Sequence, residues 1–119
     1  MNSLGDAAAY AEILEDTPKL ARERERLAFE RAIDLLEQAA AKGLRSREAF
    51  EASNYLNRLW SVLIEDLASP ENDLPPATRA DLISIGLWVL REIECIRLGQ
   101  SENFSALIDV TKSIREGLR

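Results

Sequence analysis

The fold is decided by the stretch SREAFEASNYLNRLWSVLIEDLA at residues 46–68. Its apolar side chains recur every three or four residues, at Ala49, Ala52, Leu56, Leu59, Trp60, Leu63 and Leu67. This spacing places them on one face of an α-helix, and predicts a helix with one buried side. Ser46 is a favourable N-cap residue. The helix must end near Ser69, because a residue that precedes a proline is pushed out of the α region.

The preceding segment predicts a helix over residues 17–42. Thr17 and Pro18 are favourable at a helix start, and Gly43 is a typical stop. One face carries the apolar residues Phe29, Ala32, Ile33, Leu36, Ala39 and Ala40. The highly charged residues 22–31 are expected to face water.

A third helix is predicted from Pro75 or Pro76 to the stop at Gly99. Its main apolar stripe consists of Leu82, Ile85, Val89, Ile93 and Ile96, while Ile83, Leu87 and Leu90 lie roughly opposite. Because the first half is apolar on nearly every side, we expect this helix to be the central one.

A fourth helix is predicted after Ser101 or Asn103, either of which could cap it. Its apolar side carries Phe104, Leu107, Ile108, Thr111, Ile114 and Leu118. A short helix around residues 7–15 is also expected. Short connections favour antiparallel neighbours. The sequence therefore predicts an all-α, single-domain helical bundle over residues 1–119, with four main helices and a short N-terminal helical segment.

Composition narrows the possible functions. The chain has 119 residues, 46% of them hydrophobic, and a net charge of −6. An acidic chain gains little from phosphate neutralisation, so we expect no direct binding to nucleic acid. There is no histidine, the commonest general base and zinc ligand, and no Gly-rich phosphate loop. We therefore expect neither an enzyme nor a metal or cofactor site, and interpret Cys95 as a small, half-buried apolar residue.

Apolar stretches are too short for a membrane span, since the longest, residues 82–90, is interrupted by Ser84 and Gly86. The start of the chain has neither the basic residues nor the apolar run of a signal peptide. These features predict a cytoplasmic protein that does not bind membranes.

Three residues allow two interpretations each. Trp60 and Trp88 are either core residues or interface hot spots. Gly86, in the middle of the third predicted helix, suggests that another helix comes close, from this chain or from a partner.

Several longer segments carry a family resemblance. These are RLW at residues 58–60, LIEDLASPEN at 63–72, LP at 74–75, and LISIGLWV at 82–89. Five shorter segments agree with them, namely YAEIL at 10–14, RERE at 22–25, NF at 103–104, LI at 107–108 and IREGL at 114–118. Together they resemble the flagellar regulator family FlaF over essentially the whole chain.

The resemblance implies a cytoplasmic protein that is needed for flagellin to be made and exported. It implies flagellin as the partner, bound as by a secretion chaperone, most simply at a terminal helical segment. The regulator FlbT, which acts on flagellin messenger RNA, is a possible second partner. The alternative function is post-transcriptional regulation of that messenger RNA, directly or together with FlbT.

Pattern alone supplies candidate partner-binding residues. The third predicted helix carries Ile83, Leu87 and Leu90 beside Trp88, more apolar surface than one buried face requires. The second predicted helix likewise carries Val62 and Ile64 outside its main stripe. We expect part of this surplus to line a groove, covered by residues 10–14, with Tyr10 and Leu14, when no partner is present. Leu87→Ser or Leu90→Ser should then weaken binding with little effect on stability.

Overall fold

The computed structural model describes residues 17–117 of the chain. These residues form four helices, α2 (Thr17–Lys42), α3 (Arg47–Ala68), α4 (Pro76–Arg97) and α5 (Phe104–Gly117), and contain no strand. The predicted all-α class and the four main helices are confirmed. The expected short helix near residues 7–15 lies outside the described residues, as do the side chains of Tyr10, Leu14 and Leu118.

Local sequence signals set the ends of these helices. Gly43 has a φ of +100°, a backbone conformation that ends α2 and suits glycine. The hydroxyl of Ser46 then accepts a hydrogen bond of 3.0 Å from the Ala49 N–H, which caps α3 as predicted.

Both predicted capping residues form hydrogen bonds at the start of α5. The side-chain oxygen of Asn103 accepts a bond of 3.4 Å from the Ala106 N–H. The Ser101 hydroxyl accepts one of 3.1 Å from the Asn103 N–H, and itself donates to Glu92 on α4 at 3.1 Å. The loop is thereby fastened to the end of α4.

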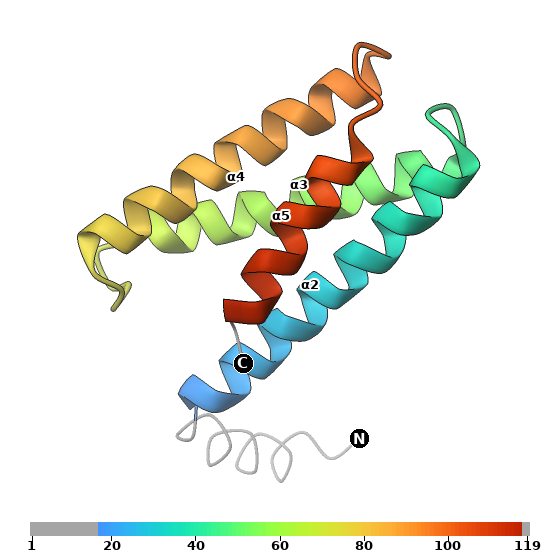
Figure 1. The fold of residues 1–119 in the computed structure, drawn as a ribbon. Coiled ribbons are helices and arrows are strands. Elements are labelled where there is room, and N and C mark those ends of the chain that lie inside the picture. Colours follow the sequence, from blue (N-terminus) through green and yellow to red (C-terminus); the bar gives the residue numbers. More distant parts are fainter. Residues whose placement is uncertain (1–16, 118–119) are drawn as a thin grey trace, which may run out of the picture.

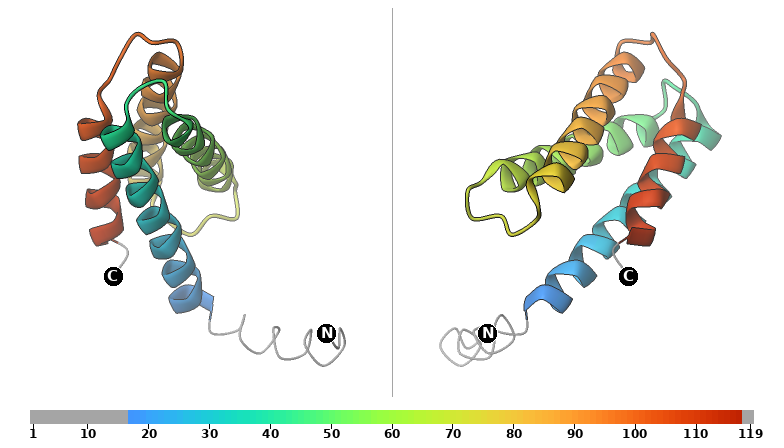
Figure 2. Two further views of the ribbon diagram at one scale, coloured as in Figure 1. Left: turned by 90° about the vertical axis from the view of Figure 1, so that its right-hand side faces the viewer. Right: turned by 60° about the vertical axis from the view of Figure 1, so that its left-hand side comes forward.

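The four helices are splayed and pack as a row of neighbours in the order α5, α2, α3 and α4 (Figures 1 and 2). Helices α3 and α5 lie on opposite sides, with α2 and α4 between them. Helix α2 packs along α3 and α5, whereas α4 packs along α3. The prediction that α4 is the central helix is therefore wrong, because α2 and α3 are the helices with two close neighbours. The edge between α4 and α5 is the open one.

The core lies mainly between α2 and α3, with contributions from the other two helices. Trp60 is 2% exposed, and its ring meets that of Phe29 edge to face, with 5.9 Å between the ring centroids. Trp60 is thus a core residue. The buried indole N–H has no hydrogen-bond acceptor among the described residues. Along α2, Ala40 is exposed instead of buried and Leu35 is buried, because α3 packs against that side.

Gly86 marks a close approach of α4 to α3. A Cβ atom there would lie 2.6 Å from Cε3 of Trp60 and 2.9 Å from Cδ1 of Ile64. The neighbour is therefore a helix of this chain, and the tight contact is made by its side chains. Glycine lets the large Trp60 ring fit under α4.

The charged start of α2 does not face water throughout. Glu25 and Arg26 are half-buried. Arg26 forms an ion pair with Glu23 and another with Glu30, the second at 2.7 Å. Burial raises the pKa of Glu25 above its ordinary value, and the carboxylate of Asp66 on α3 raises it further.

Candidate partner-binding groove

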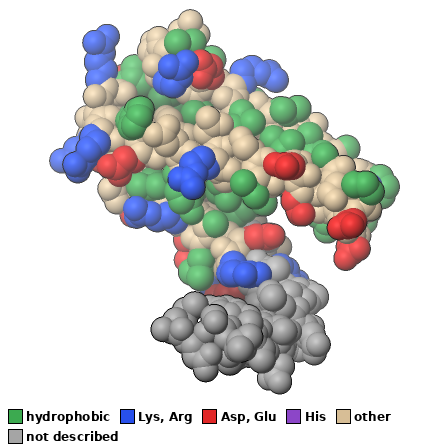
Figure 3. Space-filling view, turned by 180° about the vertical axis from the view of Figure 1, so that it is seen from behind, with side chains coloured by type: hydrophobic (Ala, Val, Ile, Leu, Met, Phe, Trp, Pro, Cys, Tyr) green, Lys and Arg blue, Asp and Glu red, His purple; other side chains and the backbone are tan. Residues whose placement is uncertain are grey.

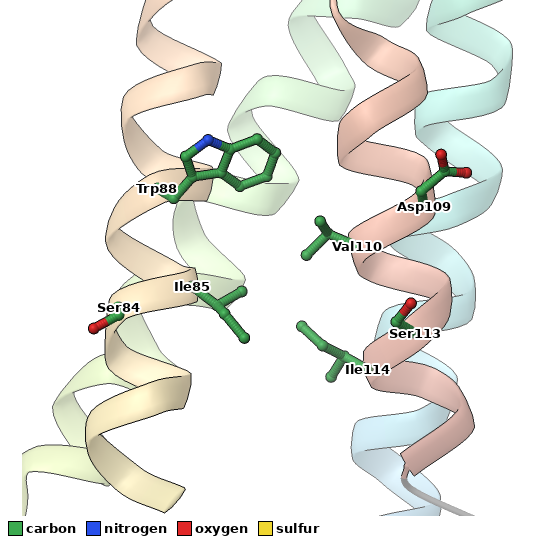
Figure 4. Close-up of a pocket in the computed structure, with 7 residues that line it drawn as sticks. All are labelled: Ser84, Ile85, Trp88, Asp109, Val110, Ser113 and Ile114. Carbon is green, nitrogen blue, oxygen red and sulfur yellow. The ribbon is translucent and has the colours of Figure 1, made fainter. Parts of the chain in front are cut away.

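A groove runs along the open edge between α4 and α5, with a volume of about 500 Å³. Figure 4 shows Ile85 and Trp88 pointing from α4 toward Val110 and Ile114 on α5. The rim carries Ser84, Asp109 and Ser113. The two helices present apolar side chains to each other without packing together.

The chemistry of this groove suits a binding surface. Its walls are apolar, and the lining includes one charged residue, the exposed Asp109. Among residues 17–117 there is no group of three or more side chains able to hold a metal ion. The groove can therefore shield an apolar surface from water and pair its single carboxylate with a cation.

The predicted partner-binding residues fall in different places. Trp88 lines the groove, is half-buried and also packs against the core. Val62 and Leu87 are 65% and 49% exposed, outside the groove. Ile64 and Leu90 pack against the core, and Ile83 is half-buried. The structure thus separates residues that the pattern had grouped together.

The α5 wall of the groove was missed by sequence reasoning. Ile114 was placed in the buried stripe of its helix, and so was Ile85 on α4. Val110, however, lies outside the α5 stripe, as Val62 lies outside that of α3. The search for surplus apolar residues, applied to α5 as well, would have indicated Val110.

A family model described as flagellar protein FlaF matches residues 6–118. The chain belongs to the FlaF family. The resemblance seen in the sequence is thereby confirmed, and the protein is a flagellar one. Neither the curated proteins nor the solved structures give a significant match.

The match includes all four helices, so the groove is built from residues within the shared family domain. Within the described part of the chain, every helix is too short or too polar to cross a membrane.

Proposed function

We propose that this FlaF-family protein binds flagellin in the cytoplasm as a secretion chaperone, and so supports flagellin synthesis and export. The groove between α4 and α5 is the observation that carries the proposal. In this reading it holds a terminal helical segment of flagellin before export.

The open edge of the bundle fits an amphipathic helix. Ile85 and Trp88 form one apolar wall and Val110 and Ile114 the other, so a helix laid between them loses apolar surface to both. Covering the apolar face of a flagellin segment also prevents that segment from assembling too early.

The charge on the groove rim favours a bound segment that carries a basic residue. Asp109 on the rim has no ion-pair partner within the described part of the chain. A bound segment with Lys or Arg beside its apolar stripe would pair with this carboxylate. The net charge of −6 favours protein over messenger RNA as the direct ligand, so any effect on messenger RNA would pass through a partner such as FlbT.

Isothermal titration calorimetry with monomeric flagellin tests the proposal. We expect a Kd in the micromolar range or tighter, roughly −8 kcal/mol. Val110→Ser, in the groove, should weaken binding about tenfold, because it removes apolar contact from one wall. Val110 also packs against the core, so the variant is compared at a temperature at which circular dichroism shows it folded. The matched change Val62→Ser lies outside the groove and should leave the Kd unchanged. No binding by the unaltered chain, to whole flagellin or to its separate termini, would refute the proposal.

A further inference from the structure

Phe50 is a second conspicuous apolar feature, on a different side of the bundle. It lies in the second turn of α3 and is 63% exposed. Leu98, just after α4, is 55% exposed. Large apolar side chains that are this exposed and border a hollow indicate an interaction site.

Phe50 stands between two such hollows. One has a volume of about 360 Å³ and lies between α3 and the end of α4, where Leu44, Ile96 and Leu98 line it. The other, of about 240 Å³, lies between α2 and α3, where Leu35 and Tyr55 line it. We call the residues lining both hollows the Phe50 surface.

The charge of this surface is opposite to that of the whole chain. Its charged residues are Arg31, Arg45, Arg58, Arg97 and Glu51. Thus four arginines accompany one glutamate on a protein of net charge −6. Seen from behind, basic and acidic side chains alternate at the top and on the left of the bundle, and acidic ones predominate on the right (Figure 3).

Two of these arginines lack acidic partners. Arg31 pairs with Asp34 at 3.4 Å, and Arg97 pairs with Glu94. Arg45 and Arg58 are exposed and form no ion pair among the described residues. The surface thus offers two available guanidinium groups on either side of an exposed aromatic ring.

We propose that the Phe50 surface binds an acidic, amphipathic segment of a second partner protein. Carboxylates of that segment pair with Arg45 and Arg58, and its apolar side chains pack against Phe50 and Leu98. The aliphatic lining of the larger hollow favours this occupant over RNA. Leu44, Ile96 and Leu98 line that hollow, and a peptide can fill it with apolar side chains, whereas RNA has none to offer.

The Phe50 surface and the groove share no lining residue. Binding of the second partner therefore needs no residue of the groove. The proposal does not depend on flagellin being the occupant of the groove.

Fluorescence anisotropy on the full chain provides the test. The probe is a labelled synthetic peptide of about four helical turns, with Phe and Leu on one face and glutamates beside them. We expect a Kd on the order of 10 µM at about 0.1 M salt. The same peptide with Gln in place of Glu should bind about fivefold more weakly or worse, because its charge-assisted bonds are lost.

Variants locate the binding. Phe50→Ser, Arg45→Glu and Arg58→Glu should each weaken it about fivefold or more, since each removes a contact or reverses a charge. Arg91→Glu makes the same charge change on an exposed α4 residue outside both hollows and should have no effect. Val110→Ser should also have no effect, which separates this surface from the groove.

Three results would overturn the inference. The first is that the acidic peptide does not bind at millimolar concentration. The second is that its binding is unchanged in Phe50→Ser and Arg58→Glu. The third is that single-stranded oligouridine binds more tightly than the peptide at the same residues. Circular dichroism of each variant shows whether it is folded, as expected for changes at exposed positions.

Discussion

Replacing Gly86 with alanine should destabilise the protein, although alanine is the better helix former by about 1 kcal/mol. The added methyl group would meet the ring of Trp60 at 2.6 Å, and that ring is fixed in the core. Overpacking costs about 1–3 kcal/mol, so we expect a net loss of about 1 kcal/mol in urea unfolding. Gly117→Ala is the matched control, because a Cβ there meets nothing within 4 Å. Equal stability of the two variants would show that α4 does not approach α3 this closely.

A second residue, Glu25, should make the stability of the folded chain depend on pH. Its raised pKa means that the folded chain holds this proton more tightly than the unfolded chain does. The stabilisation that comes from this tighter proton binding is fully present below about pH 4.3 and is lost as the pH rises through the raised pKa. Glu25→Gln keeps the side chain neutral at every pH. It should therefore raise the melting temperature at pH 7, and the gain should shrink toward pH 4.

Glu94→Gln is the control for this effect. A hydrogen bond from Arg97 lowers the pKa of Glu94, so the sign is opposite. Its replacement should give no gain at pH 7. A gain of equal size in both variants would contradict the assignment to Glu25, because it would reflect only the reduced negative charge of the chain.

At the scale of the helix, α4 has two apolar sides with different roles. Leu87 is exposed, whereas Leu90 packs against the core. Leu90→Ser should lower the stability by about 2 kcal/mol, near the lower limit for a buried leucine because Leu90 is only partly buried. Leu87→Ser should leave the thermal midpoint nearly unchanged. This revises the expectation from sequence that both variants would remain stable, and equal midpoints would contradict the revision.

Helix bounds could be predicted from the sequence, because they depend on local chemistry. Gly43 and Ser46 act within one turn of where they stand. Helix neighbours could not be predicted in the same way. The apolar sides of α4 indicated that it would be surrounded, but periodicity does not distinguish a side covered by this chain from one left open. Ile85, expected in the core, does pack against it, but it also lines the groove.

At the scale of the whole molecule, the bundle leaves one edge open and places a basic surface on another side. The groove between α4 and α5 is apolar with a single carboxylate, whereas the Phe50 surface carries four arginines. The proposed binding of flagellin uses the groove, and the proposed second partner uses the Phe50 surface. The proposed role in binding flagellin is the central one.

Photo-crosslinking tests that role most directly. A benzoylphenylalanine in place of Ser113, on the groove rim, should form a covalent product with flagellin on irradiation. The same replacement at Asn57, exposed on α3 away from the groove and both hollows, should form none. Mass spectrometry of the Ser113 product should place the crosslink in a terminal segment of flagellin. Crosslinking from Asn57 but not from Ser113 would contradict binding in the groove.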